Sequence, residues 1–204
     1  VYCQGLNQDG QVGHVGQCTS ANEGANRVPI PAPVSLIMAE TEFFCAITNN
    51  GQIYCWGLDR NHVISSAGTG ISPTTSGCAE SSVPSPQHLD RIPGKAINIS
   101  MSTEAPASAH ACAITEVSGQ NKIYCWGGNQ FGQSGQPIST VVASPTEVTL
   151  PAGEIPSQVM VGYQHTCTLS QSGKVYCFGD NSYLQLGLAA TSGSASPRLI
   201  DLSQ

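Results

Sequence analysis

One five-residue segment recurs four times along the chain, and its pattern of apolar and small positions is that of a half-buried β-strand. Each copy opens with Val or Ile, continues with Tyr and Cys, and ends in Gly. The copies are Val1–Gly5, Ile53–Gly57, Ile123–Gly127 and Val175–Gly179. The repeated cysteine returns after 52, 70 and 52 residues, so each unit holds about four short strands, the size of a propeller blade.

Other segments recur in register with this strand. A second Cys-bearing strand precedes three of the copies, at Glu42–Ile47, Ala109–Ile114 and Gln164–Leu169. A turn with the frame Asn, three residues, Gln, one residue and Gly follows the first, third and fourth copies, but the second copy lacks the Gln and Gly. Polar connectors then lead to short β-prone segments just after a Pro, where we expect the Pro to stand at the strand entrance. These segments are Val34–Ile37, His88–Leu89, Glu147–Leu150 and Arg198–Ile200.

The spacing of the cysteines tests this interpretation. A three-residue hairpin loop at Asn49–Gly51 places Cys45 directly opposite Cys55. The loop Gln171–Gly173 does the same for Cys167 and Cys177, and the longer loop Glu116–Asn121 keeps Cys112 opposite Cys125. Opposed strand residues lie about 4.5–5.5 Å apart, which suits a disulfide. We therefore predict three cross-strand disulfides, and each isolated pair lacks the further Cys or His ligands of a zinc site.

Cys3, Cys18 and Cys78 do not stand opposite another cysteine in this repeated hairpin. Cys18 and Cys78 both lie in connectors and form a candidate bridge between neighbouring units. Cys3 is left over, because the Cys strand that would face it should precede Val1. We expect either a processed or truncated chain or an intermolecular bond. Nine cysteines in 204 residues favour an oxidising, extracytoplasmic compartment over a cytosolic protein with buried thiols.

The amino-acid composition narrows the class of protein further. Charged residues make up only 10% of the chain, beside 22 Gly and 13 Pro, which suits an all-β protein of many short strands. The net charge is −6 with seven Lys and Arg, so the electrostatic basis of nucleic-acid binding is missing. No apolar run approaches the roughly 18 residues that a membrane span needs. The chain opens inside a strand without a Met or signal peptide, so we expect Val1 not to be the natural start.

These motifs resemble the regulator-of-chromosome-condensation (RCC1-like) repeat family across essentially the whole chain, most clearly over His110–Gly135 and His165–Gly187. The family pattern is a His-x-Cys-x-Leu strand, a Val-Tyr-Cys-Trp-Gly strand and an Asn-x-x-Gly-Gln-Leu-Gly turn, and the paired cysteines look like a bacterial, exported branch. Gln4 replaces the Trp, and Phe44 precedes Cys45 where other copies have a small residue. The resemblance implies a seven-bladed ring, of which a single domain over residues 1–204 supplies about three and a half blades. The chain would then be a fragment of a ring, an open arc, or half of a two-copy ring.

Several side chains could serve as functional groups. His110 and His165 share a frame position and could bind a metal, but repetition alone explains them, and no metal or cofactor is expected. Asp9-Gly10 lacks the ligands of a calcium loop and is read as a turn. Trp56, Trp126 and Phe178 could stack on sugars, but packing between blades is favoured. Asn98 begins a glycosylation sequon that lies in a predicted strand.

No motif of a hydrolase, nucleotide-binding or metalloprotease site is present, so an enzyme is not expected. We predict an exported binding scaffold that engages a protein or a surface glycan through the loops of one propeller face. The alternative is a structural module of a surface fibre or adhesin, completed by further repeats or by a homo-oligomer. The variable segments are Ser65–Ser82, Glu104–Ala109, Glu116–Asn121 and Ile138–Ser144.

Overall fold

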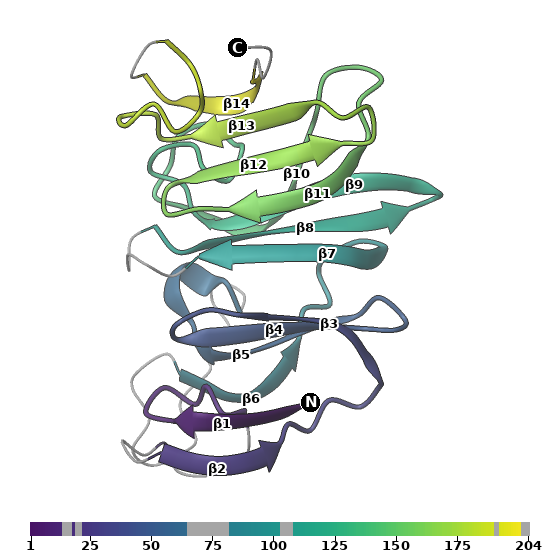
Figure 1. Ribbon diagram of the computed structural model, residues 1–204, viewed down its shortest axis with the longest axis vertical. Helices are drawn as coiled ribbons and strands as arrows, with labels where there is room; N and C mark the ends of the chain where they lie inside the picture. Colours follow the sequence, from purple (N-terminus) through teal and green to yellow (C-terminus); the bar gives the residue numbers. More distant parts are fainter. Residues whose placement is uncertain (14–17, 19–21, 65–81, 103–107, 190–191, 201–204) are drawn as a thin grey trace.

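The computed structural model describes residues 1–13, 18, 22–64, 82–102, 108–189 and 192–200. Within these ranges the chain consists of antiparallel strands and one 3-10 turn, η1 (Arg60–His62). The strands form three four-stranded sheets and one two-stranded sheet, arranged one beside the next along the long axis (Figure 1). The prediction of an all-β chain with about three and a half blades is confirmed.

Each sheet is one blade, and the blades follow the order of the sequence. Blade 1 contains β1 (Tyr2–Leu6) and β2 (Asn22–Arg27). Blade 2 contains β3 (Val34–Ala39), β4 (Phe43–Thr48), β5 (Ile53–Leu58) and β6 (Ser82–His88). Blade 3 contains β7 (Lys95–Ser102), β8 (His110–Val117), β9 (Gln120–Gly128) and β10 (Val141–Val148). Blade 4 contains β11 (Pro156–Val161), β12 (His165–Ser170), β13 (Val175–Gly179) and β14 (Ser194–Leu199). Each four-stranded blade is a meander in which the Tyr-Cys segment is the third strand.

The second and third strands of each complete blade pair in the register that the cysteines indicated. Disulfides join Cys45 to Cys55, Cys112 to Cys125 and Cys167 to Cys177, each with a Cα–Cα distance of 4.1 Å. Cys18 is buried and disulfide-bonded, whereas Cys78 lies outside the described residues, so their pairing stays a prediction. Cys3 carries a free thiol.

Two local expectations about strand ends need correction. The segment Glu116–Asn121 is not a long loop, because β8 and β9 pair as far as Val117 and Gln120. The turn is only Ser118-Gly119, whose φ angles of 51° and 80° are those of a tight two-residue hairpin. The segment Val34–Ile37 belongs to β3, the first strand of the next blade, and the outer strand of blade 1 is β2.

The prolines of the outer strands also differ from expectation. Pro86, Pro145 and Pro197 lie inside β6, β10 and β14, not at their entrances. In each of these strands the pairing with the third strand shifts register around the proline. Because these are edge strands, the missing N–H of proline removes no ladder bond that the neighbour requires.

The turn after each third strand is held by one side chain. The Oδ1 atoms of Asn7, Asn129 and Asn181 accept hydrogen bonds of 2.8–3.1 Å from the backbone N–H five residues later. In blade 2, Asp59 Oδ1 accepts the equivalent bond from Ile64 at 2.7 Å. The second turn therefore contains η1 but keeps the same side-chain anchor, which a carboxylate supplies as well as an amide.

The core lies between blades. One buried cluster joins blades 1 and 2, a second joins blades 2 and 3, and a third joins blades 3 and 4. The aromatic frame residues Trp56, Trp126 and Phe178 are each at most 2% exposed within these clusters. Trp56 Nε1 donates to Gln11 O at 3.0 Å, and Trp126 Nε1 donates to Val63 O at 2.8 Å. Each tryptophan thus bonds to the turn of the preceding blade, so this position packs and couples blades and does not offer a sugar-stacking surface.

Candidate interaction surface

Strand direction separates the loops onto two faces. The hairpins between second and third strands lie on the same side as the connectors from one blade to the next; we call this side the hairpin face (the right side of Figure 1). The turns after the third strands lie on the opposite side. Among the variable segments of the sequence, Glu116–Asn121 lies on the hairpin face, and Ile138–Ser144 belongs to the opposite side. Residues 65–81 and 103–107 lie outside the described residues.

A cleft occurs on the hairpin face at each junction between blades. Their volumes are about 320 Å³ between blades 1 and 2, 210 Å³ between blades 2 and 3, and 390 Å³ between blades 3 and 4. All three are lined by the connector that leads into the next blade, and two of them also by a hairpin tip. The repeat therefore produces a row of similar clefts whose linings differ in sequence.

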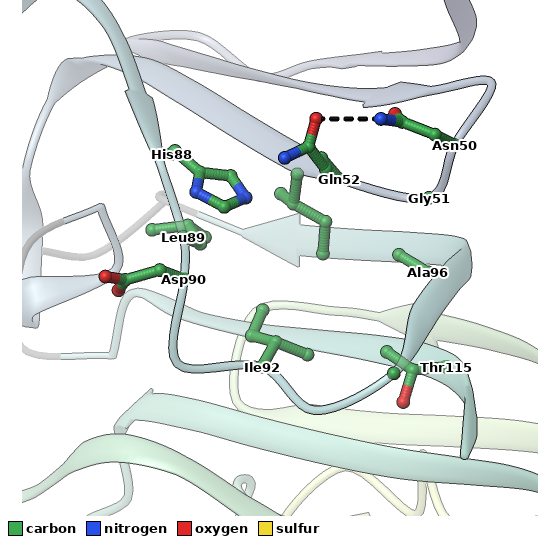
Figure 2. A pocket seen from close by; sticks show the side chains of 11 residues that line it. Asn50, Gly51, Gln52, His88, Leu89, Asp90, Ile92, Ala96 and Thr115 are labelled. Carbon is green, nitrogen blue, oxygen red and sulfur yellow. Dashed lines mark hydrogen bonds between the residues drawn. The ribbon is translucent and has the colours of Figure 1, made fainter. Parts of the chain in front are cut away.

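The cleft between blades 2 and 3 is lined mainly by polar groups (Figure 2). Asn50 and Gln52 stand at the hairpin tip, where Asn50 Nδ2 donates to Gln52 Oε1 at 3.0 Å. The His88 ring lies opposite them and stacks at a tilt on Tyr54, with ring centroids 5.1 Å apart. Thr115 is fully buried, and its hydroxyl has no hydrogen-bond partner among the described residues. Asn50, Gln52 and His88 offer donors and acceptors for contact, whereas the Thr115 hydroxyl is buried.

The cleft between blades 3 and 4 carries charge. Lys122 Nζ lies 3.0 Å from Glu147 Oε2, and Lys174 Nζ lies 2.6 Å from Glu154 Oε1. The hydrogen bond from Lys174, followed by those from Ser172 and Ser170, lowers the pKa of Glu154 to about 2. Asn121 Nδ2 donates to Pro156 O at 3.1 Å and ties the hairpin tip to the next blade. This cleft is therefore a charged, solvent-facing site whose groups are already paired with one another.

One side chain from the outer strand of each blade, near the hairpin face, contributes to a column that crosses the blades. In every blade the repeated Tyr of the third strand faces one residue of the outer strand. That residue is exposed in all four blades, and its chemistry differs each time. The column consists of Arg27, His88, Glu147 and Leu199. Sequence reasoning missed it, although in three units its member stands two residues after the Pro of the repeat.

The two frame histidines do not converge on a metal site. His110 is fully buried, with Nδ1 3.0 Å from Ser108 O and Nε2 3.0 Å from Thr166 Oγ1, so both ring nitrogens are engaged. Burial lowers the pKa of His110 to about 4, and a nearby His165 acts in the same direction. Over the part of the chain that the structure describes, no three His, Cys, Asp or Glu side chains are grouped to hold a metal ion.

The other candidate residues have structural surroundings. Asp9-Gly10 forms part of the first turn, where Asp9 N donates to Gln11 Oε1 at 2.8 Å and Gly10 has a φ of 75°. Asn98, which opens the sequon, lies half-buried in β7, and its Oδ1 accepts a hydrogen bond of 3.0 Å from Val159 N of blade 4. That bond uses the side chain to join two blades.

No helix within the described ranges is long and apolar enough to cross a membrane.

Comparison with known proteins agrees with this architecture. Two family models for the regulator of chromosome condensation (RCC1) repeat match the chain, one over residues 41–62 and 157–185 and the other over 120–169 and 172–204. Together these segments cover more than half of the sequence. The repeat register, the blades and both matches place the chain in the RCC1 repeat family.

Two curated relatives match different shares of the chain. The Ultraviolet-B receptor UVR8 of Arabidopsis thaliana is 26% identical over 97% of this chain and 52% of its own length. The X-linked retinitis pigmentosa GTPase regulator of Canis lupus familiaris is 37% identical, but over 41% of this chain and 8% of its own length. The chain thus spans about half or less of the length of these curated relatives.

Solved structures show the same fold at low sequence identity. Human WBSCR16 superposes with a TM-score of 0.73 and 17% identity, over 99% of this chain and 48% of its own. A chain in the structure of Kap60 bound to yeast RCC1 (Prp20) gives a TM-score of 0.69 with 18% identity, over 90% of this chain and 41% of its own.

Proposed function

We propose that this protein, acting as one domain over residues 1–204, is an exported, non-enzymatic scaffold that binds a protein partner through its hairpin face. The observation that carries the proposal is the column Arg27, His88, Glu147 and Leu199. Opposite the constant Tyr, the four successive blades carry a guanidinium, an imidazole, a carboxylate and an aliphatic side chain. Repeat proteins use such arrays, in which the scaffold is constant and exposed positions vary, for recognition.

The chemistry of the face suits an extended surface better than a small substrate. The clefts are open, and their charged groups form exposed pairs such as Lys122–Glu147. Pairs of this kind contribute little to stability and can exchange partners when a charged surface approaches. The UVR8 relative is named as a receptor, and the yeast RCC1 structure contains a bound protein, Kap60. Both support a binding role for the fold.

The disulfides support the exported setting. The cross-strand bonds of blades 2 and 3 are fully buried in the clusters between blades. In blade 4, Cys177 is 3% exposed and Cys167 is partly buried. Protein disulfides form and persist in oxidising compartments, and are rare where glutathione keeps thiols reduced. A reducing cytosol would have to form and keep three such bonds in one small chain.

The experiment is affinity capture from the extracellular medium of the source organism, with matched variants. The column variant combines His88→Ala with Glu147→Ala, and the control combines Ile138→Ala with Tyr183→Ala on the opposite face. All four side chains are exposed, so both variants should fold like the parent. We expect the column variant to lower affinity about tenfold or more, in the range of interface hot spots, and the control to leave it unchanged.

Equal loss in both variants, or loss only in the control, would overturn the assignment to the hairpin face. If binding disappears when the captured component is deglycosylated, the partner is a glycan and not a protein surface. The fibre or adhesin alternative predicts a different solution state: mass measurement would then show concentration-dependent assemblies in place of a monomer.

A further inference from the structure

The hairpin of blade 2 differs from those of blades 3 and 4 in the side chain that precedes a shared glycine. Gly51 has a φ of 81° at the hairpin tip, and the equivalent glycines of blades 3 and 4 have φ angles of 80° and 83°. The residue before the glycine is Ser118 in blade 3 and Ser172 in blade 4, but it is Asn50 in blade 2. Asn50-Gly51 is the only Asn-Gly pair in the sequence. Blade 2 therefore carries an amide where the other hairpins carry a hydroxyl.

An asparagine followed by glycine loses its amide group without an enzyme. The Gly51 nitrogen, after giving up its proton, attacks Cγ of Asn50 and closes a succinimide ring, and the Nδ2 group leaves as ammonia. Water then opens the ring at either carbonyl, so the products are aspartate and isoaspartate, with one water consumed and one ammonia released. The attack is intramolecular, and glycine favours it because no Cβ stands beside the attacking nitrogen.

The amide of Asn50 is both accessible and held at its two ends (Figure 2). Asn50 is exposed at the hairpin tip, so water reaches it and ammonia can leave. Thr48 Oγ1 donates a hydrogen bond of 2.5 Å to Asn50 Oδ1, and Asn50 Nδ2 donates one of 3.0 Å to Gln52 Oε1. Attack on Cγ places negative charge on Oδ1. The Thr48 hydroxyl therefore stands where a donor stabilises the developing oxyanion.

The turn both requires the glycine and slows its attack. A Cβ on Gly51 would lie 2.7 Å from Lys95 Cβ, so packing against blade 3 keeps a glycine at this position. Gly51 N donates to Thr48 O at 2.8 Å, and this bond has to break before the nitrogen can attack. Opening of an exposed hairpin tip is a local fluctuation that leaves the rest of the blade folded. The reaction is therefore paced by opening of the turn.

We propose that Asn50 is a site of spontaneous deamidation in the folded protein, with the Thr48 hydroxyl stabilising the reacting amide. The product replaces the donor to Gln52 Oε1 by a carboxylate oxygen, so two acceptors meet at the hairpin tip. The isoaspartate form also lengthens the backbone of the loop by one carbon. Gly51 O accepts a hydrogen bond of 2.9 Å from Ala96 N, so a shift of the loop reaches the start of β7 in blade 3. The cleft between blades 2 and 3 thus gains a negative charge as the protein ages, and any effect of that charge on a partner rests on the proposed function.

The test incubates the folded chain in water labelled with heavy oxygen, and peptides are then analysed by mass spectrometry. Deamidation during the incubation carries the label, whereas deamidation during digestion in ordinary water does not. We expect Asn50 to react before any other asparagine and to yield both aspartate and isoaspartate, the latter detected with protein-L-isoaspartate methyltransferase. The rate should rise with pH, because Gly51 N must lose its proton before it attacks.

Three variants separate the hydroxyl of Thr48 from the general stability of the loop. Thr48→Val removes the hydroxyl with little change of shape and should slow the reaction about three- to tenfold, as expected for the loss of one hydrogen bond. Thr48→Ser keeps the hydroxyl and should react at a rate close to that of the parent. Asn50→Ser reproduces the residue of the other hairpins and should leave this loop unmodified.

An equal or faster rate in Thr48→Val would overturn the proposal, because loosening of the turn and not the hydroxyl would then control the reaction. Reaction at other asparagines as fast as at Asn50, or formation of aspartate without isoaspartate, would overturn it as well. These last two outcomes are read on the parent chain, so they hold even if Thr48→Val does not fold. None of the readouts involves a binding partner, and the proposed function is therefore tested separately.

Discussion

Replacing Trp126 by Phe tests whether the hydrogen bond between a tryptophan and the preceding turn couples neighbouring blades. Trp126 is 2% exposed, and its Nε1 donates to Val63 O at 2.8 Å. Val63 is 1% exposed, so the substitution leaves its carbonyl without a partner in a buried setting. Phe178 occupies the same frame position in blade 4, which shows that the fold accepts a phenyl ring there.

The expected loss has two parts. An unsatisfied buried carbonyl costs about 1–3 kcal/mol. Removing the second ring of the indole deletes further apolar contact, worth about 1–2 kcal/mol at roughly 0.8 kcal/mol for each CH₂-sized group. We therefore expect the free energy of unfolding to fall by about 2–5 kcal/mol, in the range of other substitutions that leave a cavity and an unpaired group.

Urea unfolding and native-state hydrogen exchange measure this effect and its location. Only two tryptophans are present, so each single variant keeps one fluorescent reporter. In a stack where blades contact only their neighbours, amides around η1 and β9 should lose protection while those of β12 and β13 keep it. The matched variant Trp56→Phe removes the bond to Gln11 O and should weaken blades 1 and 2 instead. A change below about 0.5 kcal/mol, or an equal loss of protection in all blades, would refute the coupling.

Three further predictions concern the turns, the disulfides and pH. Asn129→Ala removes the acceptor for Ser134 N and the Nδ2 donor to Pro137 O, and should lower the free energy of unfolding by about 1–3 kcal/mol in urea. Asn129→Asp keeps the acceptor but places a carboxylate oxygen against Pro137 O, so it should not recover this loss. Replacing Cys112 and Cys125 together by Ser should cost about 2–3 kcal/mol in thermal or urea unfolding, with non-reducing mass spectrometry still showing the bonds of blades 2 and 4. Glu154 has a folded pKa of about 2 against an ordinary 4.5, so its stabilising contribution is present above pH 4.5 and is lost as pH falls towards 2. Acid unfolding of Glu154→Gln should lack this component, and identical pH profiles for the variant and the parent would contradict it.

Much of each blade could be read from the sequence because the interactions that define it are local. The alternation in Val175–Gly179 and the short loop before it fix which residues face each other, and Cys167 and Cys177 are only ten residues apart. The errors also have local causes. The outer strands were placed after their prolines because a strand interior normally excludes Pro, yet Pro145 sits at a register shift on an edge that tolerates it.

The candidate surface could be predicted only in part. The sequence directed attention to loops that vary in length, of which Glu116–Asn121 proved to be mostly strand. The column beside the clefts has constant spacing and no length variation, so only the pairing of His88 with Tyr54 and Glu147 with Tyr124 revealed that its members align. The column could have been found by comparing the residues that stand at the same position of each repeat and asking which of them differ in chemistry.

The sequence alone determined the repeat, the strand register and the facing cysteines, since each depends on residues within one unit. Tertiary structure decided what the units do to one another. The bonds from Trp56 to Gln11 and from Trp126 to Val63 join residues 45 and 63 positions apart, and no periodicity within a unit names those partners. These partners are set by how one blade packs against the next, which depends on residues of two different units.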